Sequence, residues 1–254
     1  MGAGSAFKTV RDSGALAEGA GPARRTDGGI AVTETGIPPG IEVVRKAVRR
    51  VSIRVLPDAT VRITAPPGCA IGPVLERHAA WISRHQARIR AVADAHAGSE
   101  DYFLLFGRHF HCVHHETTGV DEAAGEVRYT TPGALKAALK TWLARDLEGR
   151  IERRSGEMGV SPPRLTIRMQ RTRWASCSSR GTINANLRLI ALPDHLREYI
   201  VVHELAHLIE ANHSPRYWAV VHAHYPQTDT AEALLKEFWV ALERNTYWKH
   251  LGSR

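Results

Sequence analysis

The chain has 254 residues, a mass of 28.1 kDa, 43% hydrophobic residues and a formal net charge of +8, which allows one or two domains with real cores. Three widely separated cysteines exclude a disulfide framework, and the N-terminus lacks the apolar core of a secretory signal. The apolar runs are too short to span a membrane, so we expect a cytoplasmic protein in a reducing compartment.

Residues 1–39 are rich in glycine, alanine and charged residues and show little periodicity. This composition predicts a disordered tail. Residues 40–131 then predict a β-rich region with one helix. Within that region, 48–55 and 60–65 alternate apolar and basic positions around a turn, which is typical of a β-hairpin. Residues 73–95 carry apolar side chains at helical spacing.

A second β unit is predicted over residues 102–129, and it holds four histidines: His109, His111, His114 and His115. No carboxylate or second clustered element accompanies them, so we interpret them as solvated strand residues and not as metal ligands. Residues 132–254 predict a second domain, which begins with a long helix over 133–159. Strands are predicted over 164–169 and 182–189, and a C-terminal helix over 228–248.

The segment 203–207 reads His-Glu-Leu-Ala-His and follows the apolar run 199–202, which favours a buried helix. Pro193 and Asp194 provide a helix start signal. Because residues four apart share a helical face, His203 and His207 can direct imidazole nitrogens at one metal ion. Glu204 is placed to act as general base toward a metal-bound water. The sequence therefore predicts a catalytic zinc site.

A third ligand is expected from His213, which follows His207 by six residues. The same spacing occurs in the HExxHxxGxxH pattern, where glycine turns the chain back toward the metal. Here Glu210 stands at the glycine position, so we expect Asn212 to make the turn in a left-handed conformation. Three protein ligands would leave one position open for water. Other candidates for the third ligand stay open: His222, His224, Glu232 and Glu237.

Basic residues gather in two places along the chain. One group is Arg45, Lys46, Arg49, Arg50 and Arg54, and the other is Arg164, Arg168, Arg171 and Arg173. A pI near 9.7 is compatible with an anionic partner. The basic residues are nevertheless scattered, so nucleic acid stays an open partner and is not a prediction of the composition.

The segment Arg173-Trp174-Ala175-Ser176-Cys177-Ser178, with Asn184 and Asn186 and then the run from His203 to Ser214, resembles the YgjP-like zinc metallopeptidases, which are related to SprT-like proteases. The family's RxRWGSCS segment appears with Ala175 in place of glycine, and its HELxHLxxxxHS run matches in full. The resemblance covers about 43–239. It implies an α+β, zincin-like domain after a β-rich region, one zinc ion held by His203, His207 and His213, and Glu204 as catalytic base.

The resemblance implies a peptide or protein substrate that is cleaved by Glu204-assisted attack of zinc-bound water. We expect strand 182–189 to align an extended peptide, and Tyr217, Arg173 and His222 are alternative oxyanion donors. Cys177 is not expected to act as a nucleophile, since no base partner is evident. Two other functions stay open: a SprT-like protease directed to DNA-bound protein, and a non-catalytic DNA-binding module with structural zinc.

Overall fold

The computed structural model describes residues 6–10, 39–95, 97–98, 101–178 and 180–252. The chain divides into two compact units, one of residues 5–92 and one that contains residues 93–254. The predicted disordered tail, 1–39, lies outside the described residues except for strand β1 (Ala6–Val10) and residue 39. The boundary expected at 131/132 falls inside the second unit. No helix among the described residues is long and apolar enough to cross a membrane.

The first unit is a four-stranded sheet with one helix. Strand β1 pairs antiparallel with β3 (Val51–Val55), β3 pairs antiparallel with β4 (Val61–Ala65), and β4 pairs parallel with β2 (Ile41–Arg45). The hairpin predicted from the alternation of apolar and basic residues is therefore confirmed. Its inward side chains are buried, whereas the basic Arg54 and Arg62 are exposed. Helix α1 (Ile71–Ala95) confirms the helix that was predicted over 73–95.

The second unit begins with a four-stranded sheet in the order β5-β6-β8-β7. These strands are β5 (Phe103–Leu105), β6 (Arg108–His114), β7 (Gly119–Asp121) and β8 (Glu126–Tyr129). Helix α2 (Pro132–Met158) follows, as predicted. Thr131 caps its first turn, and Gly159 ends it in a left-handed conformation. Leucines four residues apart bury one face of α2 in the core.

A three-stranded sheet lies next in the chain, in the order β10-β11-β9. Its strands are β9 (Arg164–Arg168), β10 (Ala175–Cys177) and β11 (Thr182–Asn186). The strand predicted over 182–189 is shorter than expected. It ends at Asn186, whose side chain accepts a hydrogen bond from the Arg188 backbone N–H and so starts the 3-10 helix Leu187–Ala191.

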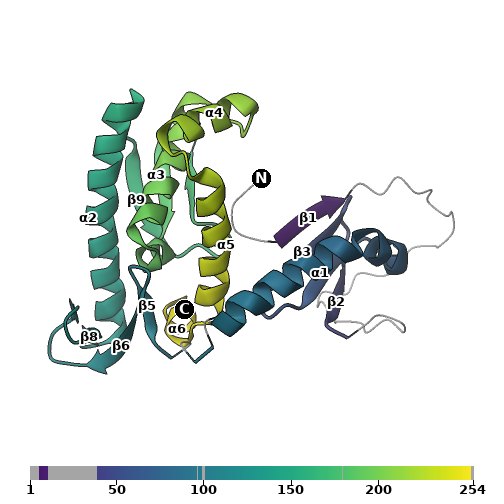
Figure 1. Ribbon diagram of the computed structural model, residues 1–254, viewed down its shortest axis with the longest axis horizontal. Coiled ribbons are helices and arrows are strands. Elements are labelled where there is room, and N and C mark those ends of the chain that lie inside the picture. Colours follow the sequence, from purple (N-terminus) through teal and green to yellow (C-terminus); the bar gives the residue numbers. More distant parts are fainter. Residues whose placement is uncertain (1–5, 11–38, 96, 99–100, 179, 253–254) are drawn as a thin grey trace. The chain divides into compact units, whose positions relative to one another are not determined.

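Helix α3 (Asp194–Ile209) packs against α2 and against β10. It is followed by α4 (Pro215–His224), α5 (Thr228–Arg244) and α6 (Thr246–Gly252) (Figure 1). The prediction of a single C-terminal helix over 228–248 is wrong, because the helix is interrupted at Asn245. That residue is extended, and its side-chain oxygen accepts a hydrogen bond from the Trp248 backbone N–H, which begins a new helix.

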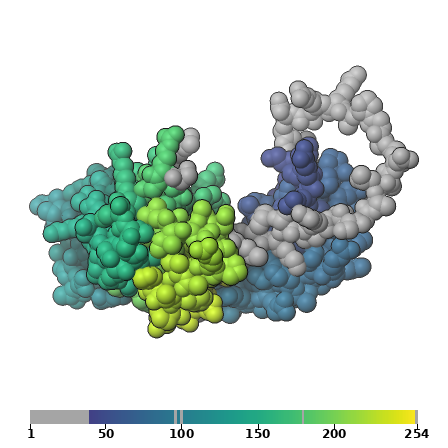
Figure 2. All heavy atoms as spheres, turned by 90° about the horizontal axis from the view of Figure 1, so that it is seen from above, coloured from purple at the N-terminus to yellow at the C-terminus, as the bar shows by residue number. Residues whose placement is uncertain are grey.

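The core of the second unit is continuous from β5 to α6. Trp174, Tyr199, Tyr217 and Trp248 are among its largest fully buried side chains. The space-filling view shows residues from about α2 to α6, coloured from teal to yellow, as one closely packed mass (Figure 2). This close-packed core therefore gives helix α3 a rigid support.

Candidate metal centre

Helix α3 is buried along most of its length, and this burial determines where its polar residues can act. Every residue from Leu196 to Ala206 is buried, including His203 and Glu204, which are 8% and 4% exposed. Because the helix places residues four apart on one face, the rings of His203 and His207 lie with their centroids 5.4 Å apart. The expected histidine pair is thus presented from one buried helix.

The third histidine reaches the pair through a turn that differs from the predicted one. Helix α3 ends at Ile209, and Glu210 leaves it in an extended conformation with φ of −138°. The left-handed conformation expected at Asn212 is wrong, since Ala59 and Phe106 are the two non-glycine residues with positive φ among those described. Instead the Ser214 backbone N–H donates to the Asn212 carbonyl, and the Ser214 side chain caps α4.

This turn brings His213 back onto the pair from α3. One nitrogen from each of His203, His207 and His213 lies within 4.8 Å of the other two. The Nε2 atoms of His203 and His213 are 3.4 Å apart. A tetrahedral site with zinc–nitrogen bonds of about 2.0–2.1 Å separates ligand nitrogens by roughly 3.3–3.4 Å. Among the described residues this is the one cluster of three or more potential ligands that fits a metal ion.

The three imidazoles are held neutral. Burial, together with the neighbouring His207 and His213, lowers the pKa of His203 to about 3. Burial also lowers the pKa of His213 to about 4. For His207, burial lowers the pKa, while backbone hydrogen bonds to Glu210 and Ala211 oppose the change. A neutral ring keeps a lone pair for a metal, so the donor set suits a divalent cation.

Tyr217 contacts all three histidines and helps to hold them in place. It is fully buried, and its hydroxyl donates a 2.9 Å hydrogen bond to the His203 backbone carbonyl. Its ring centroid lies 4.6 Å from those of His207 and His213. Trp218, the next residue on α4, stacks on His213 at 5.7 Å. Rotation of the histidine rings is therefore restricted by aromatic neighbours.

Glu204 is the carboxyl group next to the three histidines. Its Oε2 is one of the few buried side-chain polar atoms that have no hydrogen-bond partner among the described residues. Burial raises its pKa to about 7, although a backbone hydrogen bond from Cys177 and the charge of Arg173 act in the opposite direction. A buried carboxyl with an unsatisfied oxygen fits a site that receives a water molecule and a cation.

The sheet edge beside Glu204 is β10, which corrects the expectation for strand 182–189. Strand β11 is the central strand, paired antiparallel with β10 and parallel with β9. Both of its edges are occupied, so it cannot align an added peptide. In the described sheet β10 has one unpaired edge and packs against α3. We expected the peptide-aligning strand to be β11 because it precedes α3 closely in the sequence. Which strand lies at the edge of the sheet is instead set by strand pairing.

The other expected site residues lie in different surroundings. Tyr217 is an unsuitable oxyanion donor, because its hydroxyl is engaged by the His203 carbonyl. His222 is exposed on α4, 6.4 Å from the Trp218 ring, and Arg173 is exposed just before β10. Glu232 accepts a hydrogen bond from Tyr199. None of the alternative third ligands joins the histidine cluster among the described residues: His222, His224, Glu232 and Glu237.

The surroundings of Trp174 and Cys177 indicate structural roles and not chemical reactivity. Trp174 is buried in the core and meets the Trp239 ring edge to face at 4.9 Å. Burial raises the pKa of the Cys177 thiol to about 11, and the nearby Glu204 carboxyl adds to this. The thiol stays protonated at neutral pH, which agrees with the expectation that it is no nucleophile. The histidines of β6 form no metal cluster with described residues.

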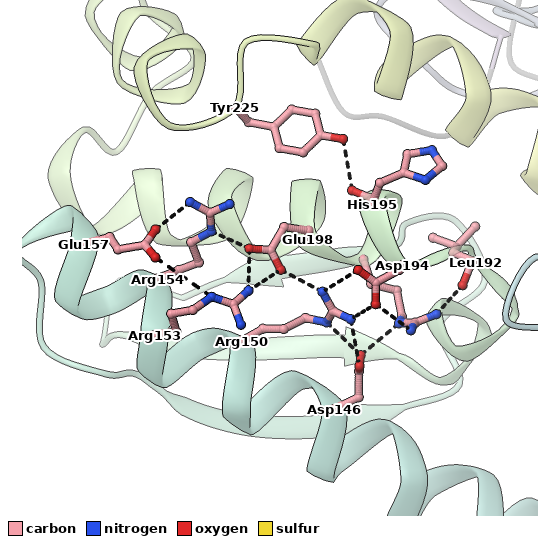
Figure 3. A network of polar contacts seen from close by, with 11 residues as sticks. Asp146, Arg150, Arg153, Arg154, Glu157, Leu192, Asp194, His195, Glu198 and Tyr225 are labelled. Atoms are coloured by element: carbon pink, nitrogen blue, oxygen red, sulfur yellow. Dashed lines mark hydrogen bonds and ion pairs between the residues drawn. The ribbon is translucent and has the colours of Figure 1, made fainter.

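An ion-pair network fixes the first half of α3 to α2 (Figure 3). Glu198 of α3 accepts hydrogen bonds from Arg150, Arg153 and Arg154 of α2. Asp146 of α2 accepts a hydrogen bond from Arg197 of α3. Burial raises the pKa of Glu198, but the three arginines outweigh it and hold that pKa at about 2. Position and tilt of the histidine-bearing helix are thereby set.

A buried HExxH helix, a returning third histidine and an α+β scaffold define the protein as a metal-dependent peptidase of the zincin kind. Consistent with this, the chain belongs to the YgjP-like family, because the model of the YgjP-like metallopeptidase domain matches residues 49–238. The family assignment implies a divalent metal and a peptide or protein substrate.

Among solved structures, the chain is similar to the crystal structure of the metallopeptidase zymogen of Pyrococcus abyssi abylysin. The match has 27% sequence identity and a TM-score of 0.32, and it covers 34% of this chain and 87% of that chain. The comparison with curated proteins produced no match. The family match therefore carries the assignment.

Proposed function

We propose that the protein is a zinc-dependent peptidase that hydrolyses peptide bonds, with one zinc ion per chain. His203, His207 and His213 are the proposed ligands and Glu204 is the proposed general base. The observation that carries the proposal is the position of Glu204, a buried carboxyl with an unsatisfied oxygen beside three converging neutral imidazoles. Structural zinc sites need no such carboxyl, because their four ligands close the coordination sphere.

Bound zinc would supply a Lewis acid that lowers the pKa of water and polarises the carbonyl oxygen of the substrate. Glu204 accepts the proton of the attacking water and holds that water toward the carbonyl carbon. It then returns the proton to the departing amine nitrogen, as general acid–base catalysis requires. The hydrogen bond from the Cys177 backbone N–H fixes the carboxyl group for both transfers.

Strand β10 is the proposed support for the substrate. Its unpaired edge lies beside the catalytic carboxyl, and an extended peptide could pair with it through backbone hydrogen bonds. This mode of binding depends little on the substrate's side chains. The flanking residues must then supply selectivity. The three cysteines are unpaired, which suits the reducing cytoplasmic compartment that we propose for the enzyme.

The experiment that tests this function compares Glu204→Gln with the native chain. Elemental analysis should find about one zinc per chain in both, because Glu204 is not a ligand. Peptide hydrolysis should fall by about 100- to 10,000-fold in the variant, since the general base is lost. Glu210→Gln, a partly exposed position after α3, is the matched control and should keep both properties.

The two alternative functions give different results in the same experiment. A non-catalytic module with structural zinc would show no peptide hydrolysis in either protein and would keep its DNA affinity in Glu204→Gln. A DNA-associated protease would be stimulated by DNA, and that stimulation would fall steeply as salt is raised. Loss of zinc in Glu204→Gln would contradict the assigned role of the carboxyl group.

A further inference from the structure

The charged residues of the sheet beside the metal centre, and of the loops that join its strands, are all basic. Between Arg164 and Pro193 the sequence has six arginines and no aspartate or glutamate. Arg188 is paired with Glu243. The remaining five are exposed and form no salt bridge with a described residue: Arg164, Arg168, Arg171, Arg173 and Arg180. Arg164 and Arg168 lie on β9 and the other three lie in the loops beside the sheet, so together they provide a field that attracts anions.

The segment that carries the third histidine lacks acidic residues as well. Residues 211–228, which carry His213 and all of α4, contain no aspartate or glutamate. Arg216 and His222 of this segment are exposed. Neither segment contains a carboxylate, so a substrate with acidic side chains that contacts them would meet no like charge from them.

Two of these arginines flank the edge strand β10. Arg173 precedes it, and the Arg173 backbone carbonyl accepts a 2.8 Å hydrogen bond from the buried Asn186 amide. The Trp174 carbonyl accepts a second one from the Asn186 backbone N–H. The backbone at this end of β10 is thus fixed, while the Arg173 side chain remains exposed.

Arg180 lies at the other end of β10, in the turn that leads to β11. This turn is closed by hydrogen bonds between Ser178 and Thr182 and between Gly181 and Ser178. A β-carbon at Gly181 would lie 3.8 Å from the Leu208 side chain, next in sequence to His207 on α3. One arginine therefore stands at each end of the strand, and the second is close to the histidine-bearing helix.

We propose that Arg173 and Arg180 select a substrate segment rich in aspartate or glutamate around the bond to be cleaved. The inference rests on the proposed function, because it takes β10 as the strand that aligns the peptide. Arginine pairs with carboxylates through two parallel hydrogen bonds, which makes it selective as well as attractive. A polypeptide fits better than DNA, because the free edge of β10 offers N–H and C=O groups that match an extended peptide backbone.

Binding to the full-length, zinc-loaded Glu204→Gln protein tests the inference without turnover. The probes are fluorescent peptides that share one apolar centre and carry flanking Asp/Glu, isosteric Asn/Gln, or Lys. We expect the acidic peptide to bind about tenfold more tightly than the Asn/Gln peptide at low salt, with the ratio approaching one at about 0.5 M salt. The Lys peptide should bind most weakly.

Substitutions in that background locate the selectivity. Arg173→Gln and Arg180→Gln should each lower the acidic-to-neutral ratio about threefold, and Arg173→Lys should restore part of it. Arg164→Gln removes the same charge from β9, at the opposite edge of the sheet, and should keep the ratio. Equal binding of acidic and neutral peptides would overturn the proposal. An equal effect of Arg164→Gln would do so too, because the charge would then act diffusely.

Three further outcomes separate this inference from its alternatives. If Arg173→Gln weakens duplex DNA binding and leaves peptide selectivity intact, the arginines recognise phosphates and the proposal is wrong. If the native chain binds the acidic peptide selectively but never cleaves it, the peptidase function fails while the selectivity stands. If Arg173→Gln lowers turnover of acidic and neutral peptides by the same factor, Arg173 acts on the reaction and not on selectivity.

Discussion

The Nε2 atoms of His203 and His213 lie 3.4 Å apart, although one belongs to a buried helix and the other to a partly exposed turn. Two neutral imidazoles gain little from this approach unless a proton or a cation lies between them. Their separation matches that of two ligands on a tetrahedral metal, which is about 3.3–3.4 Å. The turn from Glu210 to Ser214 therefore completes a site that the helix only begins.

His213→Ala and His207→Ala should each weaken zinc binding by at least about 100-fold, because even loss of a group that only orients a ligand costs 10–100-fold. Elemental analysis and competition with a chelator measure the change. His222→Ala is the matched control, since His222 is exposed on the adjacent helix α4 and lies outside the histidine cluster. Zinc affinity unchanged in His213→Ala would exclude it as a ligand.

Tyr217→Phe should lower the free energy of unfolding by about 1 kcal/mol, because it removes the buried hydrogen bond to the His203 carbonyl. Turnover should fall by less than about tenfold, since the hydroxyl is already engaged by the backbone. Loss of an oxyanion donor would cost about 100- to 1,000-fold in turnover. Denaturant titration and steady-state kinetics distinguish the two roles, and a loss of the larger size would contradict the structural role.

Glu198→Gln should destabilise the protein by about 3 kcal/mol at neutral pH, because it leaves three arginines without their shared carboxylate. The pKa of Glu198 is lowered from 4.5 to about 2, so the carboxylate's contribution is complete above about pH 4.5 and is lost as the pH falls toward 2. Denaturant titrations from pH 6 downward should show the native chain and the variant converging. A constant difference across that range would refute the ion-pair role.

Gly107→Ala should be more destabilising than Gly125→Ala, although both glycines have positive φ, of 77° and 68°. A β-carbon at Gly107 would lie 2.8 Å from that of Pro193, just before α3, whereas the position of Gly125 is open. We expect a loss of about 1 kcal/mol for Gly125→Ala and at least about 2 kcal/mol for Gly107→Ala. Thermal unfolding measures both, and equal losses would show that the contact relaxes without cost.

Much of the fold follows from local patterns in the sequence. The alternating hairpin of β3 and β4 and the long helix α2 ending at Gly159 were predicted within a few residues, and so was the start of the buried helix α3. The predicted ends of two elements were wrong where an asparagine side chain takes the place of a backbone partner in a hydrogen bond. Asn186 ends β11, and Asn245 divides α5 from α6. Such local competition is hard to anticipate, because asparagine is equally common in turns and at helix starts.

The histidine pair and its neighbouring carboxyl group could be predicted from the sequence, because the spacing of His203, Glu204 and His207 on one helix is a local property. The other features of the site depend on contacts between distant parts of the chain. The return of His213, the pairing order that makes β10 the edge strand and the contact of Tyr217 with His203 join residues through turns and sheets. Strand order depends on long-range hydrogen bonding and core packing, whose free energies no short sequence segment contains.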